Sequence, residues 1–301
     1  MRLLIAGWQG QVARALVETA PGCADIEACA VGRPGLDICE AATITRAMAD
    51  VRPDIIINSA AYTAVDQAES DVDAAFRLNR DGAGLLAQAA AQRDLPIIHI
   101  STDYVFDGAK AEPYREDDAT TPASVYGHSK LAGEVAVRGA NPRHIILRTA
   151  WVYSPFGKNF VKTMLNLAQS RDDLGVVADQ VGSPTYAPHL SAAILEIARQ
   201  VVRKGEKAAF DDARWGLYHA VGHGETSWHG LAQAVFARAA HHGAKVPSSV
   251  RAIETAQYPT PAQRPANSRL DTSKLADTFD VRLPPWQEGV DACVDRLLGD
   301  D

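Results

Sequence analysis

The stretch Gly7-Trp8-Gln9-Gly10-Gln11-Val12-Ala13 decides the fold of this 301-residue chain. It directly follows the short apolar run 3–6, which is typical of a buried strand, and it opens the amphipathic stretch 11–19, which is typical of a helix. A glycine-rich turn between a strand and a helix begins a βαβ unit. The chain is therefore expected to start with a parallel sheet.

The same turn has the chemistry of a phosphate site. Gly7 permits a tight turn, Gly10 leaves space for a pyrophosphate, and the small Ala13 lets the helix pack closely on the strand. The backbone N–H groups of Gln11 and Val12, at the start of the helix, face the anion. A mere tight turn is the alternative for such a triplet, but its place in a βαβ unit favours dinucleotide binding.

The first half of the chain repeats this pattern, because short β-branched runs alternate with Ala- and Leu-rich amphipathic stretches. Strands are predicted at 3–7, 26–31, 54–58, 97–101 and 144–148. Helices are predicted at 11–19, 41–50, 71–93 and 125–138. This alternation predicts an α/β fold with a Rossmann-type doubly wound parallel sheet.

After Trp151 the rhythm changes, because glycines and prolines interrupt short segments. A helix returns at about 190–202, and 216–221 has the pattern of one more sheet strand. We therefore predict a discontinuous dinucleotide-binding domain, 1–150 and 188–221. A second, smaller mixed α/β substrate domain is predicted at 151–187 and 222–301.

Composition excludes several classes of function. The net charge of −7 would repel a polyanion, so we expect no nucleic-acid binding. No apolar run approaches the length of about 18 residues that a membrane helix needs. The first strand begins almost at Met1, so we expect no secretory leader and a cytoplasmic location. The four cysteines and nine histidines lack the spacing of a metal site, so no metal is expected.

The end of the second predicted strand bears on the choice of cofactor. Arg33 stands near the position where a ribose-binding acid is usual, and it is suited to accept the 2′-phosphate of NADPH. A solvated loop arginine is the alternative, which leaves NADH open. Asp37 and Ile38 follow, and they are expected to hydrogen-bond and cover the adenine. Small residues after the third strand allow close approach of the cofactor at Ala60, Ala61, Tyr62 and Thr63.

The strongest chemical signal is the pair Tyr126 and Lys130. A spacing of four places both side chains on one helix face, where an ammonium would stabilise the phenolate and lower the pKa of a proton donor. An ordinary surface pair is the alternative. Thr102, at the end of the preceding strand, favours catalysis, because its hydroxyl can hydrogen-bond a carbonyl or the tyrosine.

These residues resemble the Ser/Thr, Tyr and Lys of the extended short-chain dehydrogenase/reductase family. Within it, the chain resembles the dTDP-4-dehydrorhamnose reductases in ordered blocks that span nearly its whole length, at 3–10, 58–66, 101–108, 148–153, 179–185 and 264–270. The resemblance implies NAD(P)H-dependent reduction of the C4 keto group of dTDP-4-dehydro-L-rhamnose to dTDP-L-rhamnose, the last step in the synthesis of that sugar donor. NADPH is the expected cofactor and a dTDP-linked 4-keto-6-deoxy sugar the expected partner.

The resemblance also implies roles for individual residues. Tyr126 delivers the proton, Lys130 holds the nicotinamide ribose and tunes Tyr126, and Thr102 orients the carbonyl. The cofactor contacts extend to Ile100. Sugar contacts are implied for Asp103, Tyr104, Trp151 and Arg269, whose structural alternatives are a capping Asp, a buried Tyr, a core Trp and an Arg that braces the two lobes.

Two alternatives to this function remain open. In the first, the chain reduces another nucleotide-linked 4-keto-6-deoxy sugar. In the second, it is a non-catalytic regulatory subunit of the same fold. Binding the pyrophosphate of a nucleotide sugar needs basic groups, and the second lobe has them at Lys158, Lys162, Arg264 and Arg269.

Some relatives are dimers bridged by a metal through carboxylates on the first helix. This chain has Arg14 and Ala15 there, so that metal is not expected, and a homodimer is left open.

Overall fold

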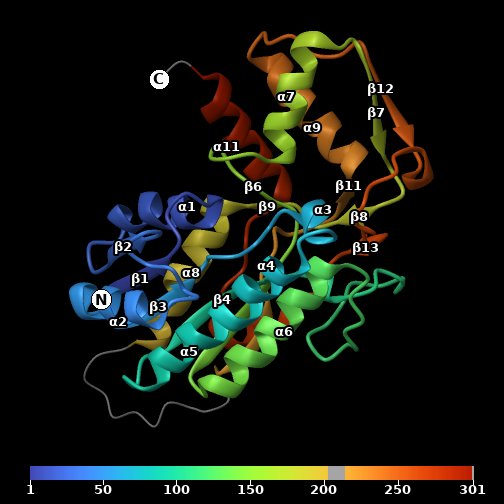
Figure 1. Ribbon diagram of the computed structural model, residues 1–301. Helices are drawn as coiled ribbons and strands as arrows, with labels where there is room; N and C mark the ends of the chain where they lie inside the picture. The colour runs from blue at the N-terminus through green and yellow to red at the C-terminus, as the bar shows by residue number, and fades with distance from the viewer. Residues whose placement is uncertain (203–213, 300–301) are drawn as a thin grey trace.

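The computed structural model describes residues 1–202 and 214–299, and it is built around a six-stranded parallel sheet (Figure 1). The strand order is β10-β5-β4-β3-β1-β2, and every neighbouring pair is parallel. The strands are β1 (Arg2–Ala6), β2 (Glu27–Val31), β3 (Ile55–Asn58), β4 (Ile97–Thr102), β5 (His144–Thr149) and β10 (Gly216–His219). The predicted fold class and the six predicted strand positions are confirmed.

The sheet reverses its direction of growth between β1 and β3. The chain runs from β1 outward to β2, then returns to the other side of β1 and proceeds through β3, β4, β5 and β10. In an open α/β sheet, ligands bind at the carboxyl ends of the strands beside such a reversal. The glycine turn after β1 and the small residues after β3 lie at this point.

Helices cover both faces of the sheet. On one face, α1 (Gln11–Thr19) and α8 (Ala187–Val201) pack over a core of leucines and isoleucines from the central strands. On the other face lie α2 (Ala41–Val51), α5 (Ala83–Ala91) and α6 (Val125–Ala140). Their apolar sides are buried at helical spacing, as the amphipathic pattern of the sequence predicts.

One predicted helix is wrong in detail. The stretch 71–93 is not a single α-helix but α4 (Val72–Phe76), a π-helical segment η2 (Arg77–Gly82) and α5. The π-helical segment lies against α6, where a Cβ on Gly133 would collide with the carbonyl oxygen of Asn79. The widened turn and the glycine therefore accommodate each other in tertiary packing, which periodicity alone does not reveal.

The second lobe occupies the upper right of Figure 1. Its helices α7 (Phe160–Ser170), α9 (Trp228–His241) and α11 (Trp286–Leu298) pack on one another around a separate apolar core. Its short strands pair as β6 (Val152–Tyr153) with β9 (Thr185–Tyr186), β7 (Asp173–Val177) with β12 (Ser249–Ile253), and β8 (Val181–Gly182) with both β11 (Thr226–Ser227) and β13 (Asn267–Ser268).

One segment lies elsewhere than the sequence suggested. The predicted substrate domain included all of 222–301, but α10 (Ser273–Phe279) packs against the large sheet. Leu275 and Phe279 are buried in the same core as β1, β3 and α8. The chain therefore returns to the sheet once more before α11. Residues 203–213 of the predicted cofactor domain lie outside the described residues.

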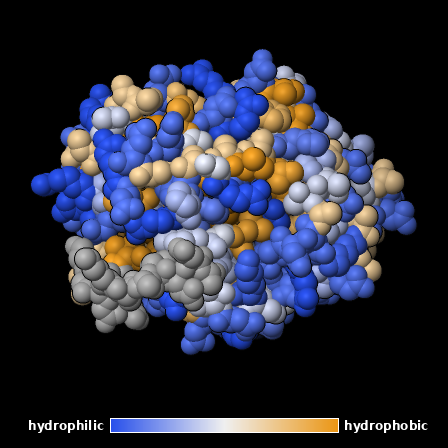
Figure 2. All heavy atoms as spheres, turned by 90° about the horizontal axis from the view of Figure 1, so that it is seen from below, coloured by the Kyte–Doolittle hydropathy of each residue, from blue (hydrophilic) through white to orange (hydrophobic). Residues whose placement is uncertain are grey.

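The surface is mostly hydrophilic on the face drawn in Figure 2, with apolar side chains in separate patches. Across the described residues, the large apolar side chains that are exposed are Trp8, Val17, Val72, Val135 and Tyr258. No helix in this part of the chain is both long and apolar enough to cross a membrane. Trp8 is notable among the exposed residues because it belongs to the glycine turn.

Candidate active site

The glycine turn has the shape that a dinucleotide needs. Gly7 adopts a φ of +103°, and a Cβ there would lie 3.3 Å from the Ser59 hydroxyl oxygen. A Cβ on Gly10 would have no heavy atom within 4 Å, so the turn opens into space at that point. No side chain caps the N-terminus of α1, and its first turn has no acidic residue. These amides therefore fit a pyrophosphate.

Helix α6 places Tyr126 and Lys130 beside the end of β4. The helix begins at its N-cap Ser124, whose hydroxyl accepts a hydrogen bond from the Gly127 amide. Two glycines of α6 allow close packing, because a Cβ on Gly127 would collide with the Tyr104 carbonyl just as one on Gly133 would collide with η2. Tyr126 and Lys130 are consequently buried.

The end of β4 carries a hydrogen-bonded group around Thr102. Its hydroxyl donates to Asp103 Oδ1 at 2.9 Å and accepts from the Tyr104 amide at 3.2 Å. Burial raises the pKa of Tyr126, a hydrogen bond with Thr102 lowers it, and the Asp103 charge raises it. Burial also raises the pKa of Asp103 to about 6, although hydrogen bonds with Ser268 and Thr102 lower it in part. Thr102, Asp103 and Tyr126 thus lie together, as the sequence predicted.

The expected effect of Lys130 on Tyr126 differs in this structure. The lysine Nζ donates to the carbonyl oxygen of Ile100 at 2.6 Å and lies 3.5 Å from His99 Nε2. Burial and the Asp103 charge keep the net pKa of Tyr126 raised, so the prediction of a lowered pKa is wrong. The spacing of four puts Tyr126 and Lys130 on one face of α6, but the Lys130 ammonium points at the backbone of β4 and not at the Tyr126 phenol.

Three residues after β2 were predicted to bind the adenosine part of the cofactor. One of them is exposed, and the other two make local structural contacts. Arg33 is exposed at the end of β2. The Asp37 carboxylate accepts a hydrogen bond from the Cys39 amide at 3.0 Å. Ile38 is buried in the helix-facing core, so its side chain is poorly placed to cover an adenine. Of the three, Arg33 is the residue whose position best fits the prediction.

The remaining predicted cofactor residues lie along the edge between β1, β3 and β4. Ala60, Ala61 and Tyr62 are half-buried there and Thr63 is exposed. The side chain of Gln11 reaches across to the second lobe, where it accepts hydrogen bonds from Ser154 and Asn159 and donates to the Val152 carbonyl. Gln11 therefore links the first turn of α1 to the second lobe.

The predicted sugar residues lie where the two lobes meet. Tyr104 is half-buried and packs edge to face on Tyr126, with 5.5 Å between ring centroids. Trp151 follows β5 with a φ of +49°, and its ring stacks on Trp228 at 3.5 Å. Trp151 is half-buried in this stack, so it belongs partly to the packing and partly to the surface between the lobes.

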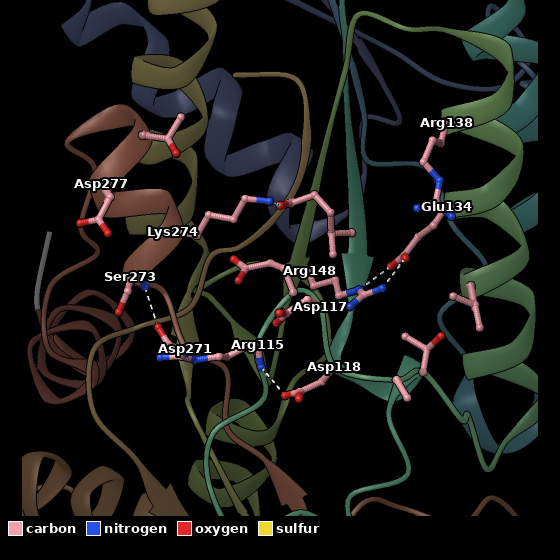
Figure 3. A pocket seen from close by; sticks show the side chains of 16 residues that line it. Arg115, Asp117, Asp118, Glu134, Arg138, Arg148, Asp271, Ser273, Lys274 and Asp277 are labelled. Atoms are coloured by element: carbon pink, nitrogen blue, oxygen red, sulfur yellow. Dashed lines mark hydrogen bonds and ion pairs between the residues drawn. The ribbon is translucent and has the colours of Figure 1, made fainter. Parts of the chain in front are cut away.

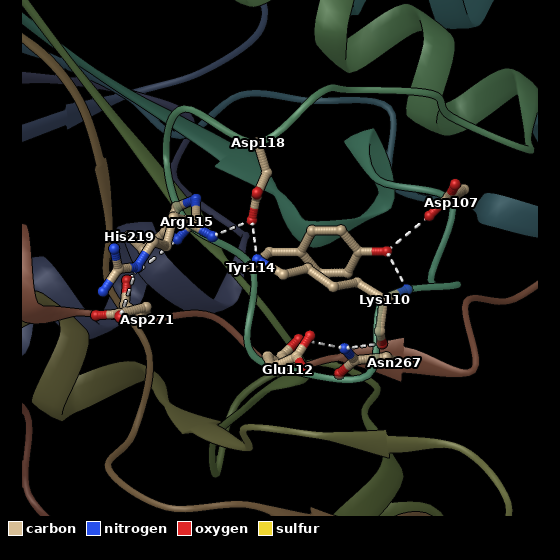
Figure 4. Close-up of polar contacts among 9 residues, drawn as sticks. All are labelled: Asp107, Lys110, Glu112, Tyr114, Arg115, Asp118, His219, Asn267 and Asp271. Atoms are coloured by element: carbon tan, nitrogen blue, oxygen red, sulfur yellow. Dashed lines mark hydrogen bonds and ion pairs between the residues drawn. The ribbon is translucent and has the colours of Figure 1, made fainter.

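Arg269 is held by structural contacts. Its guanidinium hydrogen-bonds Asn267 and the Ala111 carbonyl and pairs with Glu225. Figure 4 shows the neighbouring anchor, in which the Asn267 amide donates to the backbone carbonyls of Lys110 and Glu112. This motif therefore fixes the loop that follows β4 against β13, and the bracing alternative describes Arg269 in this structure.

A cavity of about 740 Å³ lies beside the predicted catalytic face of α6 (Figure 3). It is lined by Leu131, Glu134 and Arg138 of α6, Arg148 of β5, and residues of α10. Thr102, Tyr126 and Lys130 do not line it. Glu134 and Arg148 form a buried ion pair at its wall, with Nη2 to Oε2 at 2.7 Å. This cavity is therefore distinct from the catalytic edge.

Sequence reasoning missed three residues that the structure brings to this region. His99 lies behind Lys130, Asn79 hydrogen-bonds Ser129 and the backbone of Tyr62, and Trp228 stacks on Trp151. A histidine inside the apolar run 97–100 is a signal that could have been noticed, because a buried polar side chain in a strand needs a partner. The other two depend on contacts between residues distant in the sequence.

The fold and this edge together define a class of protein. A doubly wound parallel sheet with an open glycine turn at its reversal, and with Thr102, Tyr126 and Lys130 gathered at the same edge, is the arrangement of a dinucleotide-dependent reductase of the extended short-chain type.

The model of the family described as "RmlD substrate binding domain" matches residues 1–298, and the chain belongs to this family. The chain is 50% identical over 299 residues to a dTDP-4-dehydrorhamnose reductase of Sinorhizobium fredii, covering 99% of this chain and 98% of that protein. An Escherichia coli protein of the same name is 43% identical, over 85% and 83% of the two chains. A structure of a dTDP-4-dehydrorhamnose reductase from Bacillus anthracis in complex with NADP is 34% identical, with a TM-score of 0.88 and coverage of 98% and 99%.

Proposed function

We propose that this chain reduces the C4 keto group of dTDP-4-dehydro-L-rhamnose to give dTDP-L-rhamnose, with NADPH as the reductant. The observation that carries the proposal is that Thr102, Tyr126 and Lys130 lie at the end of β4, on the same edge of the sheet as the open glycine turn. The name and full-length identity of the Sinorhizobium fredii relative support the choice of substrate.

The chain's own residues supply positioning and a proton. The Tyr126 hydroxyl keeps its proton at neutral pH, because burial raises its pKa, so it can donate to the oxygen that gains charge at C4. Thr102 interacts with the Tyr126 side chain, and its proposed role is to orient the carbonyl. Lys130 lies one helical turn from Tyr126, where its nitrogen can bind the hydroxyls of the nicotinamide ribose. The bound nicotinamide supplies the hydride.

The cofactor would be held at the reversal between β1 and β3. Gly7, Gly10, Gln11 and Val12 form the pyrophosphate turn, and Arg33 is available for a 2′-phosphate. The proposal assigns the cofactor to the large sheet, including α10, and the nucleotide sugar to the second lobe. The proposed sugar contacts are Asp103, Tyr104 and Trp151, which lie at the boundary between the two lobes, called the seam below. For Arg269 we propose a bracing role instead, because its donors are already used.

The test is a panel of nucleotide-linked 4-keto sugars, with NADPH absorbance as the signal and the product identified by NMR. We expect the highest kcat/KM with dTDP-4-dehydro-L-rhamnose. A preference for a different nucleotide or sugar would change the proposed substrate but leave the proposed reductase activity in place. No oxidation of NADPH with any member, although NADPH binds, would favour the non-catalytic alternative. The homodimer and the cytoplasmic location remain predictions.

A further inference from the structure

A chain of buried polar groups lies behind Lys130. Its Nζ is 3.5 Å from His99 Nε2, and the other ring nitrogen, Nδ1, is 3.0 Å from the Asn58 amide nitrogen. His99 and Asn58 are 1% exposed and Lys130 is 2% exposed. The three residues come from β4, β3 and α6. Polar side chains buried this completely are stable only when their donors and acceptors match.

The position of each proton follows from the far end of this chain. Asn58 Oδ1 accepts a hydrogen bond from the Ala60 amide at 3.2 Å, so the Asn58 NH2 group must face His99 Nδ1 and donate to it. Nδ1 then carries no proton, and a neutral ring must carry its proton on Nε2. That N–H points at the Lys130 nitrogen. An ammonium cannot accept it, whereas a neutral amine can.

Burial also favours the neutral amine of Lys130, and the opposing charge of Glu134 nearby is already paired. On α6 the titratable neighbours are Tyr126 and Glu134, and on β5 Arg148 faces Glu134. The Glu134 carboxylate favours the ammonium, but it is already engaged by Arg148 and by the Ser101 hydroxyl. β3 contributes the uncharged Asn58. Burial and the Lys130 charge hold the pKa of His99 well below its usual value, and burial lowers that of Lys130 to about 8.

We propose that His99, oriented by Asn58, is a positioning residue that holds the Lys130 nitrogen against β4 and controls its protonation state. Ile100 provides the carbonyl to which the nitrogen donates, and the His99 N–H provides the donor that a neutral amine accepts. Lys130 can therefore lose a proton near neutral pH without a new partner. The proposal rests on the proposed function only where it speaks of turnover, because the pairing itself needs no substrate.

The direct test is the titration of Lys130 in protein labelled with ¹⁵N-lysine, followed by NMR of the side-chain nitrogen. The resonance is assigned as the one missing from Lys130→Met. In the wild-type protein we expect a midpoint well below the ordinary value of 10.5. In His99→Phe, which fills the ring volume without nitrogens, the midpoint should rise by about one pH unit or more. An ordinary midpoint in the wild-type protein would overturn the proposal without any variant of His99.

Two further variants separate this effect from general damage. In Asn58→Asp the side chain can only accept, so the proton moves to Nδ1 and Nε2 becomes an acceptor for the ammonium, which should also raise the midpoint. His144→Phe is the matched control, because His144 is a buried histidine at the start of β5 whose Nδ1 faces the Asn141 carbonyl. Its midpoint should equal that of the wild-type protein. A shift in the control as large as in His99→Phe would refute a specific pairing.

Turnover provides the second measurement. We expect the alkaline limb of the kcat profile to move upward in His99→Phe by the same amount as the NMR midpoint, while KM for the sugar changes little. An NMR shift with an unmoved limb would show that Lys130 protonation does not govern turnover, which contradicts control of the reaction by His99. A normal NMR result in a protein inactive toward every 4-keto sugar would instead reject the proposed function and keep the pairing.

Discussion

Asp103→Asn should stabilise the protein at alkaline pH, because the fold buries a carboxyl group that ionises with difficulty. Asp103 is 3% exposed, and burial raises its pKa from 3.8 to about 6. The native state then holds the proton more tightly than the unfolded chain does. This contribution to stability is fully present below about pH 4 and is lost as the pH rises through about 6.

The magnitude follows from the two pKa values. A difference of about 2 between them, at 1.36 kcal/mol per pH unit, corresponds to roughly 3 kcal/mol of stability lost on ionisation. Asparagine has the same shape and no charge, and its oxygen can still accept from Thr102. The variant should therefore match the wild-type protein near pH 4 and exceed its free energy of unfolding by about 2 to 3 kcal/mol at pH 8.

The assay is urea unfolding of both proteins at pH 4, 6 and 8. Asp107→Asn is the control of opposite sign. Asp107 is exposed, and hydrogen bonds from the Tyr114 hydroxyl and the Ala109 amide lower its pKa (Figure 4 shows the first). The Asp107 carboxylate stabilises the protein above its ordinary pKa, and this contribution is lost as the pH falls. Asp107→Asn should therefore have a lower free energy of unfolding than the wild-type protein at pH 8. A difference for Asp103→Asn that does not change with pH would refute the reasoning.

Three further predictions concern the site. Tyr126→Phe should lower kcat by about 10²- to 10⁴-fold with NADPH affinity unchanged, and near-normal kcat would remove Tyr126 as the proton donor. Arg33→Ala should weaken NADPH more than NADH in a direct titration, and equal losses would show that Arg33 does not contact the 2′-phosphate. Trp151→Ala should lower kcat/KM for the sugar and also lose about 1 to 3 kcal/mol of stability, because the ring stacks on Trp228. An unchanged kcat/KM would leave Trp151 with a packing role alone.

Local pattern was enough to predict the large sheet. The strands before the glycine turn and before Asn58 are short apolar runs that remain buried on both faces, and α1 has the bounds that its amphipathic stretch predicted. Thr102 and Tyr126 meet because parallel strands end at one edge of the sheet and α6 packs against that edge. These features depend on residues close in the sequence or on the topology of the fold.

The parts that were not predicted depend on contacts between distant residues. The π-helical segment exists where Asn79 meets Gly133, more than 50 residues away. The direction of the Lys130 side chain is decided by a backbone carbonyl of β4 and by His99, and neither is visible in a spacing of four. The sequence is equally compatible with Arg269 facing a phosphate, but in the structure its guanidinium contacts Glu225 and the Ala111 carbonyl. No periodic pattern encodes such choices.

On the proposed function, the seam between the two lobes is where the sugar and the nicotinamide would meet. The proposed proton donor, Tyr126, lies on α6, and the glycine turn follows β1, whereas the stacked Trp228 comes from the second lobe. The proposed reaction therefore requires the two lobes to keep a fixed relation. Gln11 ties the first turn of α1 to Ser154 and Asn159, and Arg264 pairs with Asp66 across the same seam. Because an error of about 1 Å in the approach of the reacting atoms is costly, we expect these links to contribute to specificity without contacting the substrate.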